Sequence, residues 1–235
     1  MLTLILAESA LETVPERLWT HRTIQRYTKL HRKPPQFILL DRSYHHAAMR
    51  RLEQNGKRGR PDIVHFALLE ALGSPLNKEG LLQVYVHTIG DNVIRVEPTT
   101  RLPRNYNRFV SLIEQLFEYE KIPPQPTEKA LLTTKRQTLL QLIREIKPSY
   151  VLAFSRIGKP LTLEEAVSKL TDENRPVVIV GGFPHGHFSE TTVRLANDVV
   201  SIDSEMLETW TVTSRIMYEF ERAVSLPKKR LNQRL

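Results

Sequence analysis

Residues 177–188, VVIVGGFPHGHF, combine residue types that suit close contact between a ligand and the protein backbone. An apolar run leads directly into Gly181 and Gly182, and Gly186 follows after Phe-Pro-His. Glycines at the carboxyl end of a strand let a ligand approach the backbone, and open α/β sheets bind ligands at this edge. The spacing matches neither the dinucleotide-binding G-x-G-x-x-G pattern nor a Walker loop. A purely structural turn is the alternative interpretation.

A second polar turn, residues 202–207, follows another apolar run and leads into a predicted helix. Neither this turn nor the glycine-rich turn contains Lys or Arg. Two such loops at neighbouring strand ends predict a pocket formed from backbone groups. A pocket of this kind suits an uncharged or zwitterionic cofactor better than a polyphosphate.

Metal and nucleophile chemistry receive little support from the sequence. His185 and His187 are two residues apart, His45 and His46 are adjacent, and neither pair has the spacing of ligands on one helix face. The chain has no cysteine, which excludes disulfides, thiolate metal sites and cysteine nucleophiles. No G-x-S-x-G nucleophile motif occurs either. We therefore expect no metal.

The motif RGRPD, residues 58–62, places an arginine and a carboxylate on either side of a proline. Asp62 can hold the Arg60 guanidinium by charge-assisted hydrogen bonds and so aim it. Pro61 is well suited to the first position of a helix. Asp62 has a second interpretation, as an acid in the first helical turn that interacts favourably with the helix dipole.

Arg101, Arg104 and Arg108 lie within eight residues that contain no acid. Arginine binds phosphate through paired contacts, and the neighbouring Tyr106 is able to stack on an unstacked base. These residues indicate an RNA-binding surface. A solvated basic start of a helix is the alternative.

The formal net charge of the 235 residues is +8, and it is distributed unevenly. Residues 1–150 have a net charge of +8, residues 151–224 of −4 and the tail, residues 225–235, of +4. The first part is therefore the candidate surface for a polyanion such as nucleic acid. No targeting signal or transmembrane segment is recognisable, which favours the cytoplasm and argues against a membrane partner.

Apolar runs separated by helical segments predict an α/β sheet that is covered on both faces. The predicted strands are residues 2–7, 36–40, 81–86, 92–96, 150–154, 176–180 and 198–202. The predicted helices are residues 17–30, 43–54, 61–72, 106–119, 129–146, 162–170 and 207–224. Residues 122–126 contain three prolines and are expected to form a linker.

Four motifs in this order resemble one known family: GKRGRPDIVHFALLEALGSPLNK, RLPRNYNRF, GGFPHG and SIDSEMLETWTVTSRI. Together they are similar to the Nep/Emg-type small-subunit rRNA pseudouridine N1-methyltransferases of the SPOUT class. The resemblance spans about residues 1–224. It implies one SPOUT domain over 1–224 with a C-terminal trefoil knot and a β–α extension. The RNA-binding extension is expected within 17–105, the knot and cofactor region at about 150–224, and a basic tail at 225–235.

The resemblance also implies the activity and its partners. These are S-adenosylmethionine as cofactor, N1 of a pseudouridine in small-subunit (16S/18S-type) rRNA as target, a homodimer, and a role in small-subunit biogenesis with ribosome assembly proteins as further partners. Arg60 and Asp62 are expected at the catalytic centre, and Arg60, Arg101, Arg104 and Arg108 on the RNA. The residues expected to bind the cofactor are Phe154, Ser155, Gly181, Gly186, Ile202, Asp203, Ser204, Glu205, Met206 and Leu207.

Two other functions are compatible with these residues. One is an rRNA-binding assembly factor for which methyl transfer is dispensable, and the other is a SPOUT enzyme that methylates a ribose 2′-OH. The proton acceptor is also open at this point: it is either Asp62 or water. The target nucleotide and the role of the tail are not specified by the sequence.

Overall fold

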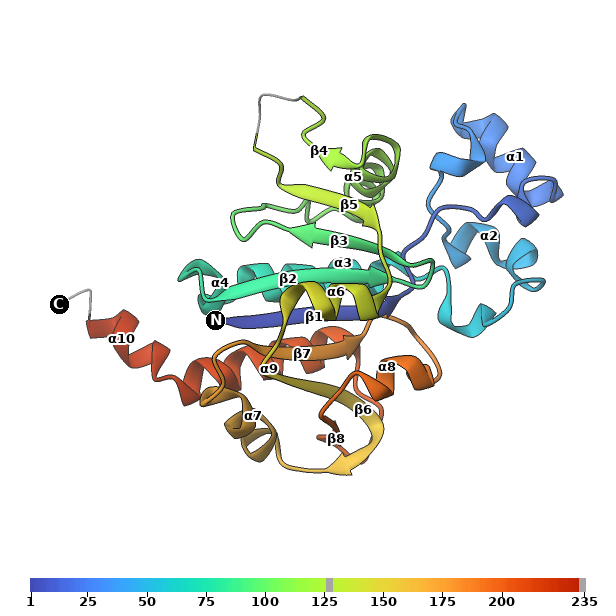
Figure 1. Cartoon of the computed structure of the whole chain (residues 1–235). Coiled ribbons are helices and arrows are strands. Elements are labelled where there is room, and N and C mark those ends of the chain that lie inside the picture. Colours follow the sequence, from blue (N-terminus) through green and yellow to red (C-terminus); the bar gives the residue numbers. More distant parts are fainter. Residues whose placement is uncertain (126–128, 233–235) are drawn as a thin grey trace.

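The computed structural model describes residues 1–125 and 129–232 and is built around one mixed β-sheet (Figure 1). Within the described residues the sheet has eight strands, in the order β4-β5-β3-β2-β1-β7-β6-β8. Their bounds are β1 Leu2–Ser9, β2 Leu82–Thr88, β3 Asn92–Val96, β4 Lys121–Ile122, β5 Leu132–Arg136, β6 Tyr150–Pro160, β7 Pro176–Gly181 and β8 Asp198–Ser201. The neighbours β2, β1, β7, β6 and β8 pair in parallel, whereas β3, β5 and β4 pair antiparallel. The carboxyl ends of the parallel strands therefore meet at one edge.

Helices cover both faces of the sheet, as the apolar strands predict. On one face lie α3 (Pro61–Gly73), α5 (Tyr106–Tyr119), α7 (Leu163–Thr171) and α9 (Thr209–Ala223). The opposite face packs against α6 (Leu139–Ile146) and residues around α8 (Glu190–Arg194). Two further helices are short: α4 (Pro75–Lys78), which follows α3, and α10 (Leu226–Asn232), which follows α9.

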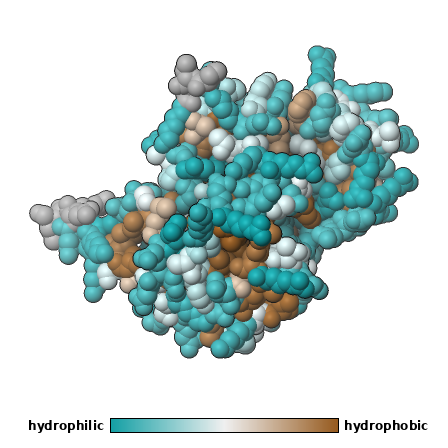
Figure 2. All heavy atoms as spheres, viewed as in Figure 1, coloured by the Kyte–Doolittle hydropathy of each residue, from teal (hydrophilic) through white to brown (hydrophobic). Residues whose placement is uncertain are grey.

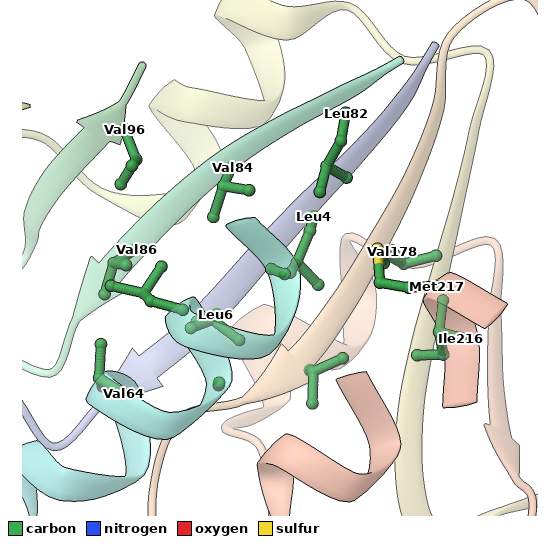
Figure 3. Packing of buried hydrophobic residues seen from close by; sticks show 14 of the residues in the cluster. Leu4, Leu6, Val64, Leu82, Val84, Val86, Val96, Val178, Ile216 and Met217 are labelled. Carbon is green, nitrogen blue, oxygen red and sulfur yellow. The ribbon is translucent and has the colours of Figure 1, made fainter. Parts of the chain in front are cut away.

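Strand β1 lies at the centre of the sheet and is buried along its whole length. Leu4 and Leu6 point to the face covered by α3 and α9, where they lie with Val64, Ile216 and Met217 (Figure 3). Ile5 and Ala7, which alternate with them, pack on the other face. This alternation is the period of two that a strand imposes, here with apolar residues on both faces.

A separate N-terminal lobe, residues 14–54, lies beside the sheet edge and contains α1 (Arg22–His31) and α2 (Arg42–Met49) (Figure 1). It has a small hydrophobic core of its own that includes Val14, Ile24 and Met49. Asp41 caps α2, because its Oδ1 accepts a hydrogen bond from the Ser43 amide at 2.8 Å. The lobe is thus held by its own packing and is connected to β1 at one end and to α3 at the other.

Two predicted elements are wrong. Residues 36–40 are not a strand of the sheet: Pro35–Phe37 form a 3₁₀ turn, and Leu39 makes one isolated bridge to Thr13. Residues 129–146 are not one helix, because Leu132–Arg136 form β5, which pairs with β3, before α6 begins at Leu139. The β-branched pair Thr133 and Thr134 favours this strand, and the pairing with β3 supplies its backbone hydrogen bonds.

The predicted linker, residues 122–126, begins inside β4, and its residue 126 lies outside the described residues. The basic tail forms α10 as far as Asn232, and residues 233–235 also lie outside the description. Among the described helices, none combines the length and apolar character needed to cross a membrane. Nor do the described residues contain a group of three His, Asp or Glu side chains placed to hold a metal ion.

Candidate active site

A cavity of about 510 Å³ opens where the carboxyl ends of β6, β7 and β8 meet. This volume lies in the range that small-molecule and cofactor sites occupy. The structure places nine of the ten predicted cofactor-binding residues around it: Phe154, Ser155, Gly181, Gly186, Ile202, Asp203, Glu205, Met206 and Leu207. Ser204 belongs to the same loop but is exposed and does not line the cavity.

The glycine-rich loop needs its glycines for two different physical reasons. A Cβ on Gly182 would lie 2.1 Å from Oγ of Ser9 and 2.9 Å from its Cα, so only glycine lets the loop pass the end of β1. Gly186 has a φ of +99°, a conformation that residues with a side chain rarely adopt. Gly182 therefore allows the loop to pack against the sheet, and Gly186 allows it to turn at the cavity.

The second loop, residues 202–207, is held by a hydrogen bond within the loop and by contacts with α9. Asp203 accepts a hydrogen bond from the Glu205 amide at 3.0 Å, and its other oxygen lies 3.6 Å from Nη1 of Arg215. Thr209, the first residue of α9, donates from Oγ1 to the Gly181 carbonyl at 2.7 Å. This contact ties the start of α9 to the end of β7, so both loops are fixed relative to each other.

Arg60 and Asp62 form the ion pair that the motif predicts. Nε of Arg60 donates to Oδ1 of Asp62 at 2.8 Å, and Nη2 donates to Oδ2 at the same distance. Pro61 begins α3 between them, as expected. The hydrogen bond to Asp62 raises the pKa of Arg60, which keeps the guanidinium charged. Arg60 also lines the cavity, so this charge lies beside the two loops.

Arg58 belongs to the same motif but has a different environment. Its Nε donates to Oε1 of Glu12 at 2.6 Å, and Nη2 contacts Oε2. Only 14% of the Arg58 side chain and 10% of the Glu12 side chain are exposed. Arg58 therefore anchors the motif to the chain that follows β1, whereas Arg60 faces the cavity.

Glu8, at the end of β1, organises the glycine-rich loop, and the sequence gives no sign of this. Its Oε1 accepts hydrogen bonds from the Ser189 amide and from Thr192 Oγ1, both at 2.8 Å. Its Oε2 lies 2.6 Å from Nζ of Lys57. Burial by itself raises the pKa of Glu8, but these hydrogen bonds outweigh it and hold the pKa below the ordinary value. Glu8 is therefore a buried, ionised anchor.

Lys57 connects this anchor to the arginine motif. Besides Glu8, its Nζ donates to the carbonyl of His187 and lies 4.4 Å from the ring centroid of Phe183. Lys57 precedes Arg58 directly in the chain, while His187 and Phe183 belong to the glycine-rich loop. The segment that carries Arg60 and the loop that lines the cavity are thus held through one ammonium group.

The three arginines of residues 101–108 lie on the surface and do not line the cavity. The segment is attached to α3 because Nε2 of His65 donates to the Pro103 carbonyl at 2.7 Å. Arg108 lines a separate shallow hollow of about 310 Å³ on α5. The side chains of Arg101, Arg104 and Arg108 form no ion pair with another described residue.

Tyr106, the residue expected to stack on a base, is partly buried and makes contacts within the protein. Its hydroxyl donates to Oδ2 of Asp41, and its ring packs against the main core near His65. Burial, together with the hydrogen bond to Asp41, raises the pKa of Tyr106 strongly. The Tyr106 hydroxyl therefore joins α5 to the lobe, and stacking of its ring on a base stays a prediction.

Several cavity residues were not predicted. Arg156 and Glu208 adjoin predicted residues, so extending each loop by one position would have included them. Ile63 and Val212 come from helices and have no chemical signature in the sequence. The full set not predicted is Ile63, Arg156, Val180, Phe183, Pro184, His185, His187, Phe188, Val200, Ser201, Glu208, Thr209 and Val212.

Fold and site define an α/β protein with a cofactor-sized cavity between glycine-rich and polar loops at the carboxyl ends of parallel strands. The family model described as EMG1/NEP1 methyltransferase matches residues 4–221. The chain belongs to the EMG1/NEP1 methyltransferase family.

Relatives match along almost the whole chain. A protein of Pyrococcus furiosus named Ribosomal RNA small subunit methyltransferase Nep1 is 46% identical over 218 residues, covering 93% of this chain and 95% of its own. A protein of the same name from Staphylothermus marinus is 41% identical over 225 residues, covering 96% and 97%.

The solved structures include a near match. The crystal structure of Archaeoglobus fulgidus Nep1 bound to S-adenosylhomocysteine has a TM-score of 0.83 and 38% sequence identity. The match covers 95% of this chain and 98% of the other. The predicted α/β class and the predicted family are therefore confirmed.

Proposed function

We propose that this protein transfers the methyl group of S-adenosylmethionine to N1 of a pseudouridine in small-subunit rRNA and so acts in small-subunit biogenesis. The observation that carries the proposal is the position of Arg60: it lines the same cavity as the glycine-rich loop and is aimed by Asp62. The names of the relatives and the S-adenosylhomocysteine bound to the Archaeoglobus fulgidus protein support it.

The cavity suits S-adenosylmethionine in shape and charge. Its loops offer backbone groups at Gly181 and Gly186, which fits recognition of an adenosine and an amino-acid portion. The cavity is lined by three carboxylates, those of Asp203, Glu205 and Glu208, and by the guanidinium groups of Arg60 and Arg156. Groups of both signs suit a cofactor that carries a sulfonium, an ammonium and a carboxylate. When bound, S-adenosylmethionine supplies an electrophilic methyl group. The ten residues predicted to bind the cofactor, Ser204 included, keep this proposed role.

In the reaction, a bond forms between the methyl carbon and N1, the sulfonium–methyl bond breaks, and the N1 proton leaves. Arg60 would stabilise the negative charge that develops on the base, and Asp62 would hold Arg60 in place. Both oxygens of Asp62 are already occupied by hydrogen bonds from Arg60. This favours loss of the proton to water, while Asp62 stays the alternative acceptor. Most of the rate enhancement would come from orientation of the two reactants.

The RNA would lie along the exposed arginines. Arg101, Arg104 and Arg108 form no described ion pair, so their guanidinium groups are available for phosphates. The target base has to leave its stack to reach the cavity beside Arg60. We therefore assign the three arginines to RNA binding and Arg60 to both RNA binding and the reaction.

The proposal includes a homodimer formed through α3 and α9. Phe66 on α3 is 48% exposed, Tyr218 on α9 is 64% exposed, and the ring centroids of Phe66 and Trp210 are 5.3 Å apart. Exposed apolar groups on two adjacent helices are typical of an interface. Light scattering should give a dimer for the native chain and a monomer for Phe66→Asp with Tyr218→Asp. A dimer that survives both changes would exclude this face.

Three further parts of the proposal stand on the family resemblance alone. These are the trefoil knot over about residues 150–224, the contact with ribosome assembly proteins, and a location in the cytoplasm. The single-domain division, with an RNA-binding extension within 17–105, is proposed with them.

A labelled-methyl assay tests the function directly. Two transcripts of the same small-subunit rRNA fragment are compared, one with uridine and one with pseudouridine at the target. We expect label only on the pseudouridine RNA, because N1 of uridine is bonded to the ribose. Label on both RNAs would favour the ribose 2′-OH instead. Tight RNA binding without label on either would favour the assembly factor.

A further inference from the structure

Two helices that pack against each other begin at the cavity. Arg60 is the residue that precedes α3, Glu208 is the residue that precedes α9, and both line the cavity. The beginnings of the two helices are in contact, because the ring centroids of Phe66 on α3 and Trp210 on α9 are 5.3 Å apart. A guanidinium and a carboxylate therefore enter one cavity from two neighbouring helix starts.

Glu208 is the carboxylate of the cavity that acts most strongly on Arg60. The pKa of Arg60 is raised chiefly by its hydrogen bond to Asp62, and the negative charge of Glu208 raises it further. Asp203, another carboxylate of the cavity, is instead occupied by the Glu205 amide and lies 3.6 Å from Arg215. The charges of Arg60 and Glu208 thus act on the same part of the cavity.

Contacts within the protein do not account for a glutamate at position 208. Its side chain is exposed, makes no capping hydrogen bond to α9 and forms no ion pair with another described residue. Glutamate is also not among the residues that are favoured at the N-cap of a helix. The Glu208 carboxylate is therefore available to accept a hydrogen bond from a ligand.

The surroundings of this carboxylate strengthen such a hydrogen bond. Much of the cavity wall is apolar and includes Ile63, Val180 and Val212. Figure 2 shows hydrophobic residues gathered on the surface where β6, β7 and α8 lie in Figure 1, bordered by hydrophilic ones. A hydrogen bond is electrostatically stronger next to apolar groups than in water, and most of all when the acceptor is charged.

The proposed substrate offers one donor that uridine lacks. N1 of pseudouridine carries a proton, whereas N1 of uridine is bonded to the ribose. A site built to bind a substrate N–H rejects an analogue that lacks it, because the polar group of the site is then left unpaired. A carboxylate suits this position twice, since it accepts the hydrogen bond and is also able to take the proton.

We propose that Glu208 selects pseudouridine by accepting a hydrogen bond from N1–H and takes this proton during methyl transfer. A bond forms between N1 and the methyl carbon as the sulfonium–methyl bond breaks. The electron pair of the N1–H bond stays on the base, and the proton passes to Glu208 and then to water. The proposal rests on the proposed function and adds the residue that recognises the reacting atom.

The test compares Glu208→Ala and Glu208→Gln of the full-length protein with Glu205→Gln, which removes another carboxylate from the same cavity. Small-subunit rRNA fragments with uridine or pseudouridine at the target compete for each protein in the presence of S-adenosylhomocysteine. Single-turnover methylation of the pseudouridine fragment is measured at saturating S-adenosylmethionine. Because an amide oxygen accepts a hydrogen bond but takes no proton at neutral pH, Glu208→Gln separates recognition from proton transfer.

We expect the native protein to bind the pseudouridine RNA about tenfold more tightly than the uridine RNA, as one hydrogen bond to a charged group provides. Glu208→Ala should lose this preference, whereas Glu205→Gln should keep it and Glu208→Gln should keep part of it. Single-turnover methylation should be about 100-fold slower in both Glu208 variants, and Glu208→Asp should recover part of the rate. Melting temperature and S-adenosylhomocysteine affinity should stay close to native in all Glu208 variants.

Two results would overturn the proposal. One is a Glu208→Ala protein that keeps both the preference and the rate. The other is weaker binding of S-adenosylhomocysteine by Glu208→Ala with an unchanged preference, which would assign Glu208 to the cofactor.

Failure of this proposal and failure of the proposed function give different results. A native protein that methylates N1, together with a Glu208→Ala variant of unchanged rate and preference, overturns only the role of Glu208. A native protein that transfers no methyl group, but prefers the pseudouridine RNA through Glu208, supports recognition by this residue and overturns only the activity.

Discussion

The cofactor side and the RNA side of this protein are built in opposite ways. The cavity is formed by loops whose positions are fixed by buried contacts, such as Glu8 with Ser189 and Gly182 against Ser9. The RNA side presents long, charged side chains that are exposed and largely unpaired. The cofactor cavity therefore depends chiefly on its shape, whereas the RNA side depends chiefly on its charge. Substitutions in the cavity should therefore weaken cofactor binding, and substitutions on the RNA side should weaken RNA binding.

The largest effect on cofactor binding should come from Gly182→Ala. The added Cβ would lie 2.1 Å from Oγ of Ser9 and 2.9 Å from its Cα, so the loop has to move away from β1. Overpacking of this kind costs about 1–3 kcal/mol. We expect a lower melting temperature and the loss of S-adenosylhomocysteine binding in calorimetry. The control is Gly73→Ala, where nothing lies within 4 Å of the new Cβ. Native cofactor affinity in Gly182→Ala would refute the importance of loop shape.

Two neighbouring arginines should separate stability from function. Arg58→Ala leaves Glu12 buried without its partner, which should cost about 3 kcal/mol of folding free energy. Arg60→Ala breaks a pair whose side chains are 37% and 29% exposed, so the stability loss should stay below about 1 kcal/mol. Instead, turnover should fall by about 100-fold and RNA binding should weaken.

Urea unfolding and single-turnover methylation distinguish these two arginines. S-adenosylhomocysteine affinity should be unchanged in Arg60→Ala. If Arg60→Ala instead lost cofactor binding and kept its RNA affinity, the assignment of Arg60 to the RNA side would be wrong.

Glu8→Gln should have an intermediate effect that depends on pH. The pKa of Glu8 is held below its ordinary value of 4.5 in the folded protein. The ionised carboxylate therefore contributes stability that is fully present above about pH 5 and is lost as the pH falls through the lower, folded pKa. Native protein should be more stable than Glu8→Gln near pH 7, and the difference should shrink on acidification.

Cofactor affinity provides a second measurement on Glu8→Gln. Because Glu8 holds Ser189, Thr192 and Lys57, we expect S-adenosylhomocysteine to bind about tenfold more weakly, which corresponds to about 1.4 kcal/mol. A stability difference that stays constant from pH 7 to pH 3 would show that the charge of Glu8 is not what holds the loop.

The smallest effects should come from single substitutions in the exposed arginine segment. Replacing Arg101, Arg104 or Arg108 by Ala should weaken RNA binding only severalfold each and reduce the salt slope by about 0.7–0.9 per phosphate contact. Melting temperature and cofactor affinity should stay native. A change in cofactor affinity comparable to that of Gly182→Ala would remove the distinction between the two regions.

The sequence predicts those parts of the fold whose signal is local. Apolar runs identify β1 and β7, and Pro61 and Gly73 mark the start and end of α3. Residues 129–146 mislead because their leucines suggest one helix, although β5 pairs with a strand some forty residues earlier in the chain. That pairing depends on tertiary contacts that local periodicity does not contain.

The residues of the candidate site likewise divide into those that the local sequence reveals and those that it does not. Its glycine-rich and polar loops are recognisable because their residue types are unusual at strand ends. Glu8 is not, because in the sequence it is one acid after an apolar run and resembles a surface residue. Only the parallel pairing of β1 with β7 brings its carboxylate to Ser189, 181 residues away.

Mass spectrometry of the target nucleoside tests the proposed methyl transfer most directly. The native protein is first allowed to react with a pseudouridine-containing small-subunit rRNA fragment and S-adenosylmethionine. We expect a single added methyl group on the base, at N1, and a gain that is about 100-fold slower with Arg60→Ala. A methyl group on the ribose, or an unmodified nucleoside despite tight RNA binding, would contradict it.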